Sequence, residues 1–130
     1  MTKIWTNGCF DILHRGHIEL FKYAKHLGNE LTVDVDSDRK IMRDKCIYRP
    51  INNLEDRMEI LNSIRYIDRV VHFDSRDELE YIIKHYNTDI IVVGSDLKGK
   101  EVIGGKHCKE IKFFDRIDKY STTKILNNAN

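Results

Sequence analysis

Two histidines three residues apart, His14 and His17, stand where a β-forming segment gives way to a helical pattern. The segment before them, residues 3–6, is rich in β-forming residues, and apolar residues at helical spacing follow them. The first turn of a helix has unpaired backbone N–H groups and the positive end of the helix dipole, so it favours phosphate groups. We therefore expect both imidazoles to reach one bound phosphate.

Alternating strand and helix patterns are expected to position this turn. Strand patterns cover residues 30–35, 68–73, 89–93 and 109–114, helical patterns cover 54–64 and 77–86, and a short helix begins at Ser121. The basic segment 36–53 is predicted to be mostly irregular, with one helical turn. This alternation predicts a Rossmann-like, doubly wound α/β fold with a parallel five-stranded sheet. Ligands bind such sheets beyond the carboxyl ends of the strands.

Composition limits the classes of function. The 130 residues predict a single domain, residues 1–130, and 22 basic against 21 acidic residues give no reason to expect binding to nucleic acid or to a membrane surface. The chain has no run of 18 apolar residues and no signal-peptide pattern, which favours a cytoplasmic protein. The three cysteines are far apart and do not indicate a disulfide framework.

The histidine turn has a specific pattern, in which Gly8-Cys-Phe-Asp11 precedes His14-Arg-Gly-His17. It resembles the cytidylyltransferase-like nucleotidyltransferases, which include glycerol-3-phosphate cytidylyltransferase, the heptose-phosphate adenylyltransferases and pantetheine-phosphate adenylyltransferase. The resemblance implies transfer of a nucleotidyl group from an NTP to a small phosphorylated alcohol or sugar, with release of pyrophosphate. It also implies Mg²⁺ bound with the NTP, and a homodimer.

Further motifs resemble different branches of this family. Arg43-Asp-Lys45 ahead of Arg49-Pro-Ile-Asn52 resembles the heptose-phosphate adenylyltransferases, as does the Asn7-Gly8 turn. The segment 64–68, Ile-Arg-Tyr-Ile-Asp, resembles the glycerol-3-phosphate enzymes. Its Arg65 follows Arg57 by eight residues, which predicts that both lie on one side of a helix. The resemblance implies a phosphate-anchoring or a structural ion-pair role for both.

The two C-terminal motifs also resemble the glycerol-3-phosphate enzymes. Residues 94–100 satisfy the P-loop pattern, but Glu101 stands where a P-loop needs Ser or Thr for magnesium, so we reject a P-loop. The alternative is a nucleotide-binding loop that contains Gly94 and Asp96. Arg116 ahead of Ser121-Thr-Thr-Lys124 matches the family's last motif, although Ile117 replaces a threonine there.

The resemblance implies a set of site residues. Catalytic roles are implied for His14, His17, Lys45 and Arg116. Nucleotide binding is implied for Cys9, Phe10, His14, His17, Arg65, Gly94, Asp96, Arg116, Ser121, Thr122 and Thr123, and acceptor binding for Asp11, Arg43, Lys45 and Arg57. Asp11 is expected to orient the turn and not to react. No metal bound by protein side chains is expected, since a zinc site from Cys9, His14, His17, His107 and Cys108 has no familiar spacing.

The identity of the substrates stays open at this level. We favour CTP with glycerol 3-phosphate, and the alternative is ATP with a heptose 1-phosphate. A hypothesis of a different class is a nucleotide-binding module without catalysis. The intact histidines argue against that hypothesis, because a module that only binds could lose them.

Overall fold

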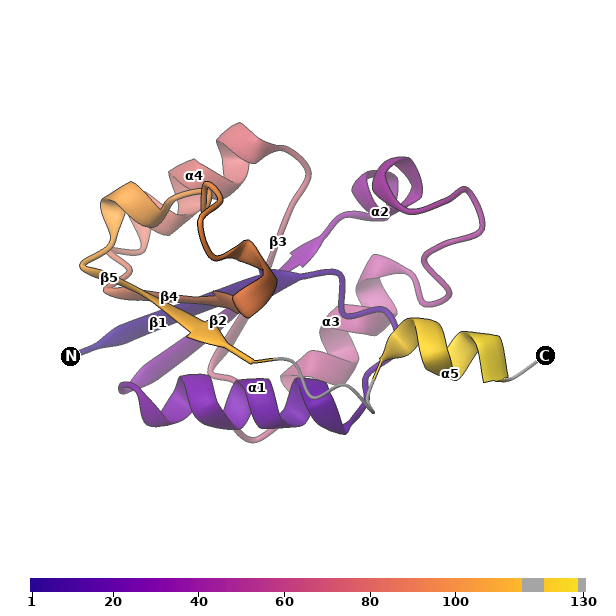
Figure 1. Cartoon of the computed structure of the whole chain (residues 1–130), viewed down its shortest axis with the longest axis horizontal. Coiled ribbons are helices and arrows are strands. Elements are labelled where there is room, and N and C mark those ends of the chain that lie inside the picture. Colours follow the sequence, from indigo (N-terminus) through magenta and orange to yellow (C-terminus); the bar gives the residue numbers. More distant parts are fainter. Residues whose placement is uncertain (116–120, 129–130) are drawn as a thin grey trace.

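The computed structural model describes residues 1–115 and 121–128 and has one five-stranded parallel sheet (Figure 1). The strands lie in the order β3-β2-β1-β4-β5. They are β1 (Lys3–Gly8), β2 (Glu30–Asp36), β3 (Arg69–Phe73), β4 (Ile90–Gly94) and β5 (Glu110–Phe114). The helices are α1 (Arg15–His26), α2 (Asp38–Asp44), α3 (Leu54–Asn62), α4 (Arg76–His85) and α5 (Thr122–Asn128), with short 3-10 turns η1 (Ser95–Leu97) and η2 (Gly105–His107). The predicted α/β fold with a parallel five-stranded sheet is confirmed.

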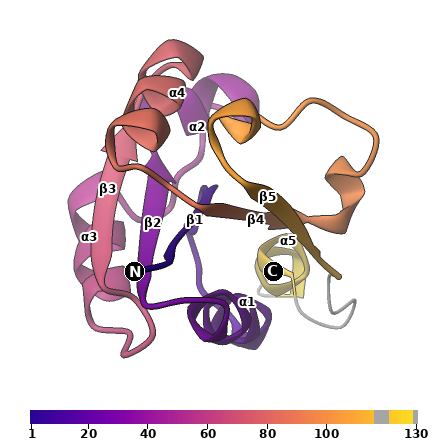
Figure 2. The same cartoon turned by 90° about the vertical axis from the view of Figure 1, so that its left-hand side faces the viewer.

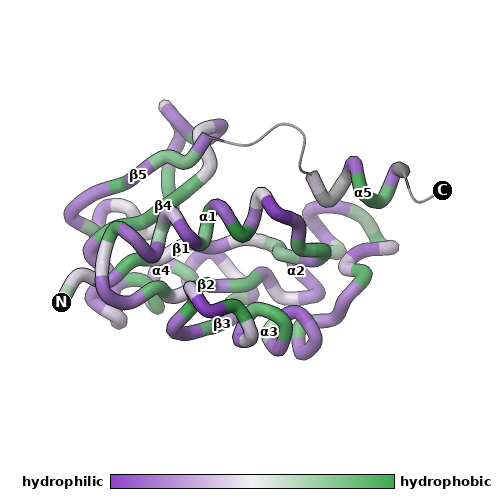
Figure 3. The backbone as a smooth tube through the Cα atoms, turned by 90° about the horizontal axis from the view of Figure 1, so that it is seen from below, coloured by the Kyte–Doolittle hydropathy of each residue, from purple (hydrophilic) through white to green (hydrophobic). Residues whose placement is uncertain are grey.

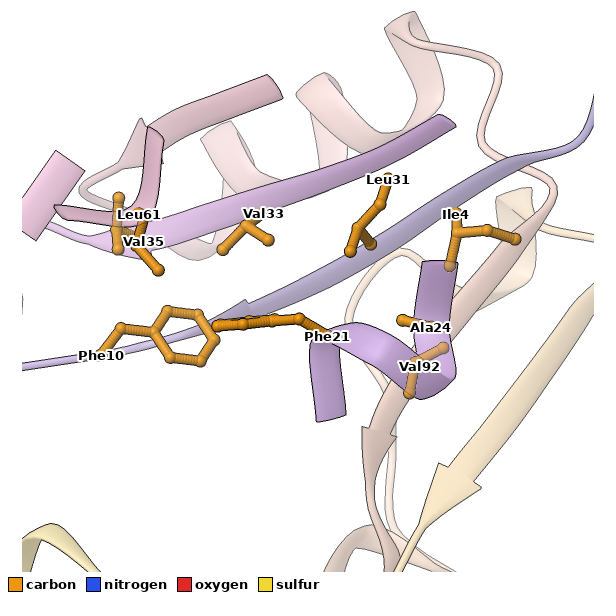
Figure 4. Close-up of a cluster of buried hydrophobic side chains, with 9 residues drawn as sticks. All are labelled: Ile4, Phe10, Phe21, Ala24, Leu31, Val33, Val35, Leu61 and Val92. Atoms are coloured by element: carbon orange, nitrogen blue, oxygen red, sulfur yellow. The ribbon is translucent and has the colours of Figure 1, made fainter. Parts of the chain in front are cut away.

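Helices cover both faces of the sheet (Figure 2). On one face, α1 and α3 bury a cluster that includes Ile4, Phe21 and Leu31, and the sticks in Figure 4 show Phe21 between the sheet and α1. On the other face, α4 packs over a second cluster that includes Trp5 and Ile83. Successive residues of a strand point to opposite faces, so the consecutive pair Ile4 and Trp5 contributes to both clusters.

The central strand β1 pairs unequally with its two neighbours. It pairs with β2 along its whole length, from Lys3 to Gly8, but with β4 only at Ile4 and Trp5. The carboxyl half of β1 is therefore unpaired on the β4 side, where the strand order changes direction. Open parallel sheets bind ligands at such switch points. The turn that carries both histidines follows β1 directly, so the fold delivers it to this position.

Two local predictions need correction. The segment predicted to be mostly irregular contains α2, whose first turn is capped by the Ser37 hydroxyl, which accepts the Lys40 N–H at 3.0 Å. Helix α3 begins as predicted, with the Asn53 side chain accepting the Asp56 N–H at 2.9 Å. It ends at Asn62, however, so Arg65 does not lie on this helix beside Arg57.

Helix α1 contains both polar and apolar residues along its length, as its hydropathy colouring shows (Figure 3). Such amphipathic helices bury one face against a sheet and leave the other in water. Over the described residues, none of the helices has the length and apolar content needed to span a membrane.

Candidate functional site

Helix α1 begins with two histidines that cap it through their ring nitrogens. His14 Nδ1 accepts the Gly16 N–H at 3.1 Å, and His17 Nδ1 accepts the His14 N–H at 3.2 Å. A ring nitrogen that accepts an N–H carries no proton, so this pattern assigns the proton of each neutral imidazole to Nε2. Both side chains thus present an Nε2–H donor at a helix N-terminus, where anions are favoured.

The two imidazole rings stack on each other, and the ring of His17 also contacts a buried phenylalanine. Their centroids are 3.9 Å apart with an interplanar angle of 28°. The Phe10 ring meets the His17 ring edge-on at 5.5 Å and the Phe21 ring at 5.2 Å. Phe10 has a φ of 49°, and its ring lies 3.0 Å from where a Cβ on Gly8 would be. A side chain at Gly8 would therefore have to displace the Phe10 ring, which supports His17 from the core.

This placement changes the role expected for Phe10. The family resemblance places it in the nucleotide pocket, whereas the side chain is 6% exposed and belongs to the core cluster of α1. A buried aromatic ring under a half-buried histidine restricts the histidine's rotamers. Phe10 therefore positions the catalytic candidate His17.

Asp11 holds a distant loop against the histidine turn. Its two carboxylate oxygens accept the N–H groups of Ile51 and Asn52, both at 2.8 Å, and Asn52 Nδ2 donates to the Asp11 carbonyl at 2.9 Å. The Asp11 side chain is 0% exposed. A carboxylate so enclosed is not open to an acceptor, so the predicted acceptor contact is wrong, whereas the orienting role expected for Asp11 agrees with these contacts.

Arg57 ties four segments together beneath the site. Its Nη1 donates to the carbonyls of Cys9 at 2.9 Å and of Asp36 at 2.8 Å. Its Nε donates to the Asn52 carbonyl at 3.0 Å, and its Nη2 forms an ion pair with Asp38 at 2.7 Å. Its side chain is fully buried. Of the two roles that the sequence left open for Arg57, the structure shows the structural ion pair, with Asp38, and not the acceptor contact. One guanidinium links β1, β2, α2 and the loop before α3.

Two basic residues of the segment between α2 and α3 act electrostatically on the end of β1. Burial raises the pKa of the Cys9 thiol, and the positive charges of Lys45 and Arg49 partly offset that rise. Lys45 is exposed just after α2, and Arg49 lies 3.5 Å from Asp11 Oδ2 through its Nε. Both charges therefore act on the end of β1, and the catalytic role of Lys45 stays a prediction. For Arg49, the sequence alone favours a solvated surface position and a role in the site equally.

The remaining predicted residues divide into two groups. Gly94 ends β4 and Asp96 lies exposed in η1, at the carboxyl edge that also carries the histidine turn. Arg65 lies at the opposite edge, three residues before Asp68, whose carboxylate accepts the Leu31 N–H at the start of β2. Helix α3 ends at Asn62, and Arg65 lies between it and the start of β3, at the amino edge of the sheet. Arg65 is therefore not part of this site. Arg43 is exposed on α2 beside Asp44.

The C-terminal motif is described only in part. Ser121 Oγ accepts the Lys124 N–H at 3.3 Å and caps α5, whose first turn contains Thr122 and Thr123. Figures 1 and 3 place α5 at the same end of the molecule as α2. Arg116 lies outside the described residues.

The described residues contain no group of three or more histidine, cysteine or acidic side chains arranged to hold a metal ion. Cys108 and His107 adjoin β5 at its amino end, because Lys109 donates to the carbonyl of Asp89 just before β4. They are therefore at the edge of the sheet opposite Cys9 and both histidines of the turn.

Known proteins resemble this chain over almost its whole length. A family model described as cytidylyltransferase-like matches residues 5–128. The bifunctional protein HldE of Campylobacter fetus is 43% identical over 126 residues, covering 97% of this chain and 27% of the relative. HldE of Nitratiruptor is 45% identical over 123 residues, which cover 95% of this chain and 26% of that relative. The chain thus spans about a quarter of the length of the curated relatives it matches.

A solved structure has the same fold. The lipopolysaccharide core biosynthesis protein from Thermoplasma volcanium superposes with a TM-score of 0.73 at 27% sequence identity, covering 91% of this chain and 99% of that one. The family match covers almost the whole chain, including the turn in which His14 and His17 cap α1. This chain belongs to the cytidylyltransferase-like family of nucleotidyltransferases.

Proposed function

We propose that this chain transfers an adenylyl group from ATP to the phosphate of a sugar phosphate, with a heptose 1-phosphate as the acceptor, and releases pyrophosphate. The relatives named HldE favour this adenylyltransferase alternative over the CTP and glycerol 3-phosphate pair preferred from the sequence. The Asn7-Gly8 turn and Arg49-Pro-Ile-Asn52, which resemble the heptose-phosphate enzymes, agree with it. The Thermoplasma protein of the same fold, which is named for lipopolysaccharide core biosynthesis, points the same way.

The observation that carries the proposed reaction is the pair of stacked histidines whose Nδ1 atoms are both engaged by backbone N–H groups. An oxygen of the acceptor phosphate attacks the α-phosphorus of ATP, the bond from that phosphorus to the bridging oxygen breaks, and pyrophosphate leaves. The attacking oxygen is already ionised at neutral pH, so no general base is required. Catalysis then consists of positioning and charge neutralisation, for which two preorganised Nε2–H donors are suited.

Other residues take roles around this pair. Lys45 adds positive charge beside the turn, and Arg116 is proposed to add a second. The nucleotide-binding side of the site is proposed to consist of Gly94, Asp96 and the first turn of α5, with Ser121, Thr122 and Thr123. The backbone around Cys9 is proposed to lie between the two substrates. Mg²⁺ is proposed to arrive on the triphosphate, where it would neutralise charge.

Pyrophosphate release tests this proposal. ATP and CTP are each combined with a heptose 1-phosphate and with glycerol 3-phosphate in the presence of Mg²⁺. We expect the highest kcat/KM for ATP with the heptose 1-phosphate. Release with CTP and glycerol 3-phosphate alone would restore the other substrate pair. Nucleotide binding without release from any pair would favour the non-catalytic module.

A further inference from the structure

We propose that Arg49 binds the phosphate of the acceptor through its guanidinium. This inference rests on the proposed function and adds a residue to which no role had been given. Arg49 is 16% exposed at its side chain, and its only ion pair with a described residue is the one between its Nε and Asp11 Oδ2, 3.5 Å apart. That Nε is buried and has no hydrogen-bond partner among the described residues.

The Arg49 charge is poorly compensated within the described structure. The Asp11 carboxylate, its ion-pair partner, already accepts two backbone N–H groups at 2.8 Å, from Ile51 and Asn52. Arg57, by contrast, has a complete set of partners in three carbonyls and a carboxylate. A largely buried guanidinium without hydrogen bonds loses hydration that an anion can replace, and its planar donors suit a phosphate in particular.

The loop that carries Arg49 is fixed to the catalytic turn from two sides. Asp11 binds the backbone just after Pro50, and Arg57 links the Asn52 carbonyl to the Cys9 carbonyl. The positive charge of Arg49 is also felt by the Cys9 thiol at the end of β1. Arg49 is therefore held in place before any ligand binds, which reduces the entropy lost on binding.

The position of Arg49 indicates which phosphate it meets. The loop joins α2 to α3, and both helices belong to the β1-β2-β3 half of the sheet. The loop with Gly94 and Asp96 follows β4, on the other side of the switch point. If the nucleotide binds to the loop after β4, the position available to the acceptor lies on the opposite side of β1, next to β2. We therefore assign the acceptor phosphate, and not the triphosphate, to Arg49.

The test compares Arg49→Met with Arg39→Met, a matched change of an arginine that pairs with Asp74 on the exposed face of α2. We expect Arg49→Met to raise the acceptor KM by about 10- to 100-fold. The ATP KM should stay within about 2-fold, and Arg39→Met should change neither. An equal rise in both KM values, or no rise in the acceptor KM, would overturn the assignment. Arg49→Lys, which keeps the charge beside Asp11, should give a smaller rise confined to the acceptor if Arg49→Met does not fold.

A binding measurement separates this inference from the proposed function. Inorganic phosphate is titrated into the wild-type protein, Arg49→Met and Arg39→Met by isothermal calorimetry, without nucleotide or acceptor. We expect Arg49→Met alone to weaken phosphate binding, by about 10-fold or more. If the wild-type protein turns over no substrate pair but shows this difference, the proposed function fails and Arg49 remains a phosphate ligand. Equal binding by all three proteins would overturn the role of Arg49.

Discussion

The buried guanidinium of Arg57 donates a hydrogen bond to the carbonyl of Cys9 at 2.9 Å, and so fixes the backbone at the start of the histidine turn. The two residues are 48 positions apart in the sequence. Since the same side chain also binds carbonyls at the end of β2 and before α3, the geometry of the turn depends on a residue beneath the site.

Replacing Arg57 by methionine should therefore lower both stability and activity. The change leaves three buried carbonyls without their donor, which we expect to cost about 3 kcal/mol or more of the free energy of unfolding. Urea denaturation with kcat measured in parallel would show it, with Arg65→Met as an exposed control. A loss below about 1 kcal/mol would contradict the central structural role of Arg57.

Substituting His17 separates catalysis from helix capping. His17→Ala should lower kcat by about 100-fold or more, because a donor to the reacting phosphate is lost, and should change ATP affinity far less. His17→Gln should largely retain stability, since glutamine at this position can still accept the His14 N–H. Equal losses of kcat and of ATP binding in His17→Ala would count against a transition-state role.

Asp11→Asn should loosen the loop at residues 49–52. The amide offers one acceptor where the carboxylate offers two, so an N–H of Ile51 or Asn52 loses its partner. We expect faster hydrogen exchange at these two amides and a loss of about 1–3 kcal/mol in stability. Glu59→Gln, on the exposed side of α3, is the control. Unchanged exchange in Asp11→Asn would show that the loop is held by other contacts.

Asp34 gives a prediction of pH dependence. Burial, together with the negative charges of Asp36 and Glu78, raises the pKa of its carboxyl from 3.8 to about 8. The native state then holds a proton that the unfolded chain releases above about pH 4, so this residue makes stability fall as pH rises from about 4 to about 8. The slope is at most about 1.4 kcal/mol per pH unit.

Urea midpoints at pH 5, 6.5 and 8 test this prediction. Asp34→Asn cannot titrate, so its stability relative to the wild-type protein should rise with pH across this range. A difference between the two proteins that does not depend on pH would mean that the Asp34 carboxyl is ionised in the folded protein at every pH tested.

Most of the fold could be predicted because its signals are local. Strand β4 is a continuous run of β-branched residues, and the N-caps of α3 and α5 are Asn53 and Ser121, residue types that favour this position. Helix α2 was predicted only as one helical turn, because only Ile41 on it is buried and its apolar periodicity is weak. Arg65 was misplaced because no residue type in the sequence marks the end of α3 at Asn62.

The interior of the site could not be predicted in the same way. His14 and His17 lie on one local turn, and their spacing alone suggests their pairing. Asp11 meets its loop 40 positions later, which only the folded chain shows. Arg57 contacts Cys9 48 positions earlier, so the resemblance could suggest that this residue matters but not that it is buried beneath the site.

The proposed function requires that the chain itself moves an adenylyl group to a phosphorylated acceptor. The most direct measurement follows the α-phosphorus of [α-³²P]ATP in a reaction with a heptose 1-phosphate, with His17→Ala run beside the wild-type protein. We predict that the label moves into a sugar nucleotide as pyrophosphate accumulates in equal amount, and that the variant loses this transfer while still binding ATP. Label that remains in ATP with the wild-type protein, although ATP and the acceptor are both bound, would contradict the claim.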